Sequence, residues 1–456
     1  MDKIIELFSL RADAFGMKKI LSKSYLVVVL LSVLFSLSVL AETAGSPAYQ
    51  ELMRKVDQLV NEQKLQAALD LINSEALTIN DSLDQARIIT KTVQFESGLH
   101  DYETAVNNFR SKKWPEDVKA QTLLNIFNAY TLQQYAQAYS WEIRQRNKIE
   151  SKEKKGLKFW TVEEIYFEAV KGMALVWSTR EKLNSFPKNE LQDFVSPNTY
   201  PQGIRDSFRD SFAHLFVRIL NDSSGWSPEQ SNEIYRLDLK NLMLGKTSAN
   251  LSLESAKPHP LEKIALVLHD LKEWHTGQRN FGAALDAELE LLKILHQRFS
   301  SSSDKSTVRQ HLENLLPNYV ETPWYSMGMG TLAQFWQQSD IPEALITARK
   351  IADQGVQKYP ASMGAKLCRD IVKEIDRPSF ELQAMKVDGS GRRSIGLDYK
   401  NLTKIHFFSF KYDIKKFLKQ NQDYHRMPDW RQVQGLIKAK PANTWSVDLL
   451  RTTDFR

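Results

Sequence analysis

The spacing of apolar residues changes once along the chain, close to Pro378, and no other feature constrains the fold as strongly. Between Tyr49 and residue 376, apolar side chains recur every three or four residues, which is the period of amphipathic helices. After Pro378 they alternate with polar neighbours, as in strands that bury one face. The sequence therefore predicts a mainly α-helical chain, with a solenoid-like region over residues 42–376 and a β part over residues 377–456.

The helical region is predicted to consist of helix hairpins. The first hairpin has apolar residues with helical spacing on both sides of a turn at residues 61–64. Residues 341–360 match the small-residue layout and the terminal proline of a tetratricopeptide-like (TPR-like) repeat. Weaker matches at residues 65–72 and 281–292 do not follow a strict period of about 34 residues. An irregular, TPR-like α-solenoid therefore fits better than a regular array.

Short sequence signals predict where individual helices begin and end. Thr161, with Glu164 three residues later, has the pattern of a capping box. Gly277 and Gly282 are expected to separate two helices, because glycine weakens a helix interior. The serine-rich stretch at residues 300–304 is expected to form a flexible loop tip.

The β part is predicted to be a partial antiparallel β-sandwich. Strand-like alternation is found at residues 379–387, 395–399, 405–412 and 445–450, with a helical insertion over residues 413–439. An immunoglobulin-like sandwich needs about seven strands, so four strands leave an exposed edge. We therefore expect the chain to be the N-terminal piece of a longer protein.

The N-terminus has the pattern of a secretory signal. Basic residues between Lys18 and Lys23 precede an apolar run at residues 25–40, and Ala41 offers a small residue for cleavage. We expect translation to start at Met17, residues 1–41 to be removed, and the protein to be periplasmic or extracellular. An uncleaved segment is the alternative, and only in that case is membrane attachment expected.

Composition narrows the classes of partner and site. The net charge is +6, and it is +4 once the first 41 residues, with five basic and three acidic side chains, are set aside. This balance does not favour a nucleic-acid partner. Cys368 is the only cysteine, which excludes an intrachain disulfide and a thiolate zinc site. Its neighbours have helical spacing, so a buried structural thiol is favoured over a reactive one.

The junction between helices and strands resembles the bacterial alpha-2-macroglobulin family. The likeness lies in residues 359–382, with Tyr359-Pro360-Ala361-Ser362, and in residues 399–411, with Tyr399-Lys400-Asn401-Leu402. Residues 445–449 resemble a strand of a first macroglobulin-like domain, and a weaker likeness covers most of residues 49–450. The resemblance implies an exported helical region that precedes macroglobulin-like β-sandwich domains.

The resemblance implies endopeptidase inhibition by protease trapping. In that family a bait segment is cut, a thioester of Cys and Gln is exposed, and the molecule closes around the protease. Here Cys368 is followed by Arg369-Asp370-Ile371 and lacks the Cys-x-x-Gln context. No residue of this chain is therefore given the covalent role, and the expected partners are target proteases.

No catalytic, cofactor-binding or metal-binding residue is assigned from the sequence. His269 and Glu273 are one helical turn apart, but a solvated helix face is favoured over a metal pair. Phe95-Glu96-Ser97 is similar to the catalytic glutamate motif of lytic transglycosylases, although a glutamate near a helix end is favoured.

Two further patterns have structural interpretations. The aromatic stripe at residues 324–336 is expected to be core, and residues 388–393 are expected to form a hairpin turn. We therefore predict a non-enzyme that has no cofactor and binds proteins rather than metals. The alternative to a protease trap is a periplasmic helical-repeat scaffold or adaptor that binds a protein partner.

Overall fold

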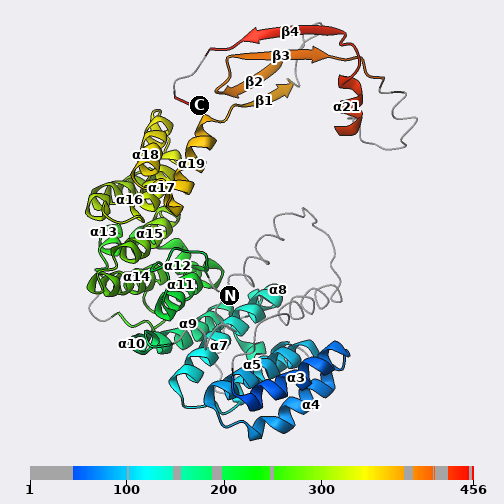
Figure 1. The fold of residues 1–456 in the computed structure, drawn as a ribbon, viewed down its shortest axis with the longest axis vertical. Coiled ribbons are helices and arrows are strands. Elements are labelled where there is room, and N and C mark those ends of the chain that lie inside the picture. The colour runs from blue at the N-terminus through cyan, green and yellow to red at the C-terminus, as the bar shows by residue number, and fades with distance from the viewer. Residues whose placement is uncertain are drawn as a thin grey trace. The chain divides into compact units, whose positions relative to one another are not determined.

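The computed structural model describes residues 45–99, 102–146, 156–186, 198–246, 251–384, 394–413, 415, 430–450 and 454–455. The predicted signal at residues 1–41 and the predicted turn at residues 388–393 lie outside these described residues. The chain divides into two compact units, Met1–Trp324 and Tyr325–Arg456. The described elements are helices up to residue 376 and mainly strands after it, which confirms the predicted fold class (Figure 1).

The first unit is built of helices that pack mainly on their neighbours in sequence. α3 packs on α4, α5 on α6 and α14 on α15, while α7 packs on both α5 and α9. The α-helices are α3 (Pro47–Asn61), α4 (Leu65–Glu75), α5 (Ser82–Leu99), α6 (Tyr102–Ser111), α7 (Val118–Ala138), α8 (Ser140–Arg144), α9 (Val162–Ser178), α10 (Arg180–Leu183), α11 (Phe208–Asn221), α12 (Pro228–Asn232), α13 (Leu239–Met243), α14 (Pro260–Gly277), α15 (Phe281–Arg298) and α16 (Ser302–Leu315). The 3-10 turns are η1 (Ala76–Thr78), η2 (Leu157–Phe159), η4 (Ser223–Gly225), η5 (Ile234–Arg236) and η6 (Leu316–Tyr319).

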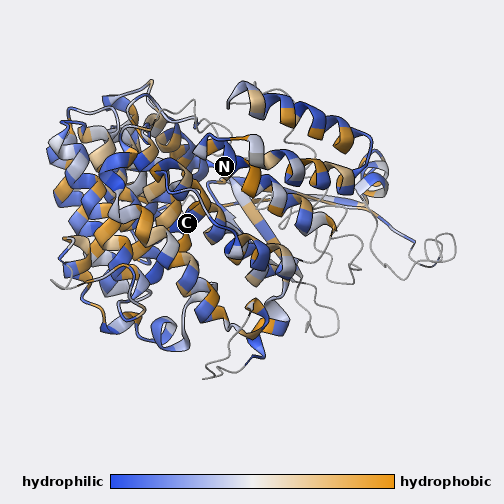
Figure 2. Cartoon of the chain, turned by 90° about the horizontal axis from the view of Figure 1, so that it is seen from below, coloured by the Kyte–Doolittle hydropathy of each residue, from blue (hydrophilic) through white to orange (hydrophobic). Residues whose placement is uncertain are grey.

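The cores of this unit combine alanines with large aromatic side chains. Figure 2 shows hydrophobic and hydrophilic residues on the same helices, as expected for amphipathic elements. Ala86 and Ala105 are fully buried where α5 meets α6, so the two helices approach closely. Phe109 fills the adjacent space, with its ring centroid 5.1 Å from Trp114 and 5.4 Å from Phe127. Such aromatic pairs add to the stabilisation that comes from apolar burial.

Hydrogen bonds at the helix ends explain where several helices begin. At the start of α9, the Glu164 N–H donates to Thr161 Oγ1 at 3.3 Å, and the Thr161 N–H donates to Glu164 Oε2 at 3.0 Å. This confirms the predicted capping box. The expected loop tip at residues 300–304 is wrong, because the Ser301 hydroxyl accepts from the Asp304 N–H at 3.0 Å and caps α16. A serine followed three residues later by an acidic residue is a helix start.

A break between α14 and α15 was predicted at Gly277 and Gly282. The break is confirmed at Gly277 but not at Gly282. α14 ends at Gly277, whereas Gly282 lies inside the first turn of α15. Asn280 provides the actual boundary, since its side-chain oxygen accepts from the Ala283 N–H at 3.3 Å.

The second unit begins with three helices that all contact one another. They are α17 (Tyr325–Gln337), α18 (Ala344–Lys358) and α19 (Met363–Asp376). A Cβ atom at Gly364 would lie 2.1 Å from the backbone nitrogen of Met327, and one at Gly355 would lie 2.6 Å from the sulfur of Cys368. Only glycine allows the backbones of α17 and α19 to come this close. In the predicted aromatic stripe, Trp324 and Phe335 are buried.

Two separate antiparallel ribbons follow the three helices. β1 (Ser379–Ala384) pairs with β2 (Ile395–Lys400), and β3 (Lys404–Ser409) pairs with β4 (Asn443–Asp448). The helix α21 (Trp430–Ile437) precedes β4, within the stretch where a helical insertion was predicted. The change from helix to strand thus occurs where the apolar period predicts it, whereas the boundary between the compact units lies three helices earlier.

Each ribbon has one apolar face. In the first ribbon Phe380 lies opposite Tyr399 and Leu382 opposite Leu397; in the second, Phe407 lies opposite Trp445 with stacked rings 5.0 Å apart. Phe380 is 57% exposed and Trp445 is 44% exposed. Among the described strand residues only Ile405 is buried, so these faces lack the cover that a closed sandwich provides.

Candidate functional site

The residues singled out in the sequence lie on three different helices, His269 on α14, Glu96 on α5 and Cys368 on α19. His269 Nε2 and Glu273 Oε1 are 4.0 Å apart on α14, with side chains 31% and 60% exposed. A solvated helix face fits this geometry. No group of three or more His, Cys, Asp or Glu side chains within the described residues is arranged to hold a metal ion.

Glu96 lies inside α5, one turn before its end at Leu99. Its side chain is buried, and Oε2 has no hydrogen-bond partner among the described residues. The hydroxyl of Ser97 donates to the backbone oxygen of Val93 at 2.7 Å, so it is engaged by its own helix. Neither of the two cavities described below includes Glu96 in its lining. The position therefore fits a glutamate near a helix end.

Cys368 is a buried thiol in the three-helix part of the second unit. Its Sγ donates to the backbone oxygen of Ser326 at 3.3 Å. Burial raises the pKa of the thiol to about 12, so the thiolate is scarce at neutral pH. These surroundings fit the structural thiol predicted from the sequence.

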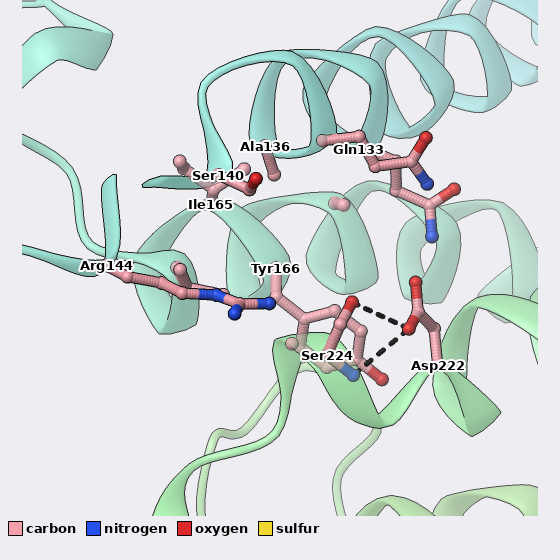
Figure 3. A pocket seen from close by; sticks show the side chains of 12 residues that line it. Gln133, Ala136, Ser140, Arg144, Ile165, Tyr166, Asp222 and Ser224 are labelled. Carbon is pink, nitrogen blue, oxygen red and sulfur yellow. Dashed lines mark hydrogen bonds between the residues drawn. The ribbon is translucent and has the colours of Figure 1, made fainter. Parts of the chain in front are cut away.

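One hollow among the described residues is a groove in the first unit between α7, α8, α9 and η4 (Figure 3). We call it the α7–α9 groove, and its volume is about 240 Å³. The residues that line it come from α7–α8 on one side, from α9 on the other, and from the segment around η4 at one end: Gln133, Ala136, Gln137, Ser140, Arg144, Val162, Ile165, Tyr166, Ala169, Asp222, Ser224 and Gly225.

The two long sides of the groove differ in chemistry. Gln133 and Gln137 lie one turn apart on α7, Ser140 and Arg144 lie one turn apart on α8, and all four line the groove. We call these four residues the polar ridge. The opposite side is formed by α9 and presents apolar residues at the same helical spacing, namely Val162, Ile165 and Ala169.

Hydrogen bonds and close packing fix the end of the groove at η4. The hydroxyl of Tyr166 donates to the backbone oxygen of Leu220 at 2.9 Å, and burial raises the pKa of Tyr166 above its usual value. Gly225 lies flat against the Tyr166 ring, because a Cβ atom there would sit 2.3 Å from the ring. Asp222 Oδ1 accepts from the N–H and the hydroxyl of Ser224, at 3.1 and 2.7 Å, as Figure 3 shows.

A second cavity, of about 250 Å³, lies beside a cluster of charged side chains around the buried Arg209. Its lining includes Trp177, Arg180 and Asp270. Asp270 pairs with Arg180 at 2.7 Å and with Arg209 at 2.6 Å, while Arg209 also contacts Glu181 at 3.0 Å. The Arg209 side chain is only 2% exposed. These charges already pair with one another, so the cluster is a structural element that joins α10, α11 and α14.

A neighbouring charge cluster connects the segment before α11 to α15. Arg205 pairs with Asp286 at 2.7 Å and with Glu290 at 3.1 Å. Although burial opposes it, Lys293 and Arg205 lower the pKa of Glu290 to about 2. Burial together with the charge of Arg205 lowers the pKa of His214 to about 4. His214 is therefore neutral in the folded protein at neutral pH.

Acidification should destabilise the first unit through His214 and His296. Burial, with the charges of Lys305 and Arg309, also lowers the pKa of His296 to about 4. Below pH 6.5 the unfolded chain binds a proton at each histidine, whereas the folded chain does so only near pH 4. Between pH 6.5 and 4.5 the free energy of unfolding should fall by about 2 kcal/mol per histidine.

Urea denaturation at several pH values measures this effect. Replacing both histidines, as in His214→Gln with His296→Gln, should flatten the pH dependence in this window. Replacement of the exposed His406 should leave it unchanged. An unaltered slope in the double variant would contradict the assignment.

No family model matches the chain, and neither a curated protein nor a solved structure is significantly similar to it. Within the described residues, no helix has the length and apolar character that crossing a membrane requires.

The α7–α9 groove was not predicted from the sequence. The spacing of the polar ridge is visible in the sequence, but polar residues at helical spacing ordinarily indicate a face that contacts solvent. The signal that was missed is their position opposite an apolar stripe at residues 162–169, on a helix that packs against α7.

Proposed function

We propose that the chain is the N-terminal part of an exported alpha-2-macroglobulin-like protein that inhibits endopeptidases by trapping them. The observation that carries this proposal is the position, among the helices and strands, of the residues that resemble the family. Residues 359–382 begin directly after α18 and span α19 and much of β1, and residues 399–411 span the end of β2 and β3. The likeness thus follows a helical region as it passes into amphipathic β-ribbons.

The ribbons support this proposal through their chemistry. A two-stranded ribbon alone is marginally stable in water, and an apolar face is stabilised by packing on another layer. Phe380, Leu382, Phe407 and Trp445 present such faces. In this proposal they belong to a macroglobulin-like sandwich, and the chain contacts proteins rather than catalysing a reaction.

The test uses the product of the complete reading frame, expressed in a bacterium with its own N-terminus. We expect it in the periplasmic fraction, with Glu42 as its first residue by mass spectrometry. After incubation with an endopeptidase, cleavage of a large protein substrate should fall while cleavage of a small peptide substrate persists. The protease should also co-elute with the inhibitor on size exclusion.

A protease inactivated at its nucleophile is the matched control, since it cannot cut a bait segment and should not be retained. Finding neither cleavage of the product nor retention of the active protease would count against trapping.

A second function, an exported scaffold that binds a protein partner, is favoured by the α7–α9 groove. The groove lies within the first unit, and Arg144 in its lining has no ion-pair partner among the described residues. Helical-repeat proteins bind partners through surfaces of this kind.

A further inference from the structure

We propose that the α7–α9 groove binds an extended peptide segment of a partner protein, and that Arg144 recognises an acidic side chain of that segment. This inference rests on the partner-binding role proposed as the second function. The groove, with a volume of about 240 Å³, is smaller than the roughly 300 Å³ at which small-molecule sites begin. It therefore suits one or two residues of a longer segment.

The polar ridge supplies hydrogen-bonding groups that are not used within the described part of the chain. The carboxamides of Gln133 and Gln137, the hydroxyl of Ser140 and the guanidinium of Arg144 have no side-chain partner there, yet all four residues line the groove. Each carboxamide offers both a donor and an acceptor. An extended peptide presents alternating N–H and C=O groups, which such carboxamides match.

The apolar side of the groove provides a place for side chains of the segment. Ile165 and Ala169 are buried and form its floor, and Val162 continues the stripe towards the start of α9. Because α9 packs along α7, this stripe runs beside the polar ridge. Successive side chains of an extended peptide point in opposite directions, so one can rest on the apolar side while its neighbours face the opening.

The charges in the lining select an acidic segment. Among the described residues of the lining, Arg144 is the one basic residue and Asp222 the one acidic residue. Figure 3 shows these two residues on opposite sides of Tyr166. Asp222 already accepts two hydrogen bonds from Ser224, as the cap of η4. Arg144 has no ion-pair partner among the described residues, and a guanidinium binds a carboxylate in a bidentate, charge-assisted manner.

Saturation-transfer difference NMR on the full chain tests the inference with two blocked peptides, acetyl-Ala-Val-Ala-Glu-Ala-amide and its Gln counterpart. The Glu peptide should bind about tenfold more tightly, as expected for a charge-assisted pair. Arg144→Gln should remove this preference, so that both peptides bind equally. Arg236→Gln is the matched control, because Arg236 is an exposed arginine outside the groove that pairs with Glu233.

Ala136→Leu tests the location, since a larger side chain in the lining should block both peptides while circular dichroism stays unchanged. If both peptides bind the unaltered protein equally and Ala136→Leu blocks both, the acidic preference is overturned and partner binding stands. If neither peptide binds, or if Ala136→Leu has no effect, the groove is not a peptide site and the partner-binding role loses its support.

Discussion

Gly364→Ala should open the three-helix part of the second unit and expose Cys368. The added Cβ would lie 2.1 Å from Met327 N and 2.4 Å from Ser326 C, which are backbone atoms that cannot rotate away. α17 and α19 must then separate, and the hydrogen bond from Cys368 to Ser326 is lost with them. We expect a cost of about 3 kcal/mol, at the upper end of overpacking substitutions.

The chain contains its own reporter for this change, because Cys368 is its only cysteine. Its reaction with a thiol reagent should accelerate about a hundredfold in Gly364→Ala, since a buried thiol reacts only when the helices open. Gly435→Ala is the control: a Cβ atom there has no neighbour within 4 Å, so the thiol should stay protected. Equal reactivity in both variants would refute the close approach of α17 and α19.

Asp270→Ala should destabilise the contact between α11 and α14 by about 3 kcal/mol. Asp270 is shared by Arg180 and Arg209, and Arg209 is almost fully buried between the rings of Trp177 and Trp274, at 5.8 and 4.7 Å. Removing the carboxylate leaves a buried cation with Glu181 as its ion-pair partner in the described structure, a side chain that is mostly exposed. Breaking a buried ion pair from one side costs about 3–5 kcal/mol.

Hydrogen exchange measured by mass spectrometry follows this loss directly, since amides of α11 and α14 should exchange about a hundredfold faster. Adding Arg209→Met should restore most of the protection, because no buried charge is then unpaired and the apolar stem still fills the space between the rings. Glu51→Ala breaks the exposed pair with Arg54 and should leave the protection of α11 and α14 unchanged. If the destabilisation in the variant with both Asp270→Ala and Arg209→Met equals the sum of the two single effects, the two side chains do not interact as proposed.

Features that depend on neighbours in sequence were predictable. The change of apolar period gives the fold class and the position of the helix-to-strand transition. The spacing of Thr161 and Glu164 gives the start of α9. The prediction of a loop at residues 300–304 was wrong because serine occurs both in loops and at helix caps. The spacing of Ser301 and Asp304 indicates the cap of a helix.

Features that depend on distant residues were not predictable. Arg205 and Asp286 are 81 residues apart, and Arg180 and Asp270 are 90 apart, so no local pattern relates them. The groove likewise requires Asp222 to meet Tyr166 across more than 50 residues. Nothing in an amphipathic helix by itself shows which polar residues face solvent and which face a hollow.

The pairing of the two β-ribbons also sets an order of folding. β1 and β2 are joined by a short connection, so their pairing closes a small loop, whereas Ser409 of β3 pairs with Asn443 of β4 across a much longer one. Loop-closure entropy rises with length, and non-local pairs form later. Phe407 is synthesised before its partner Trp445, so in that interval the backbone groups of β3 that later pair with β4 are open to mispairing.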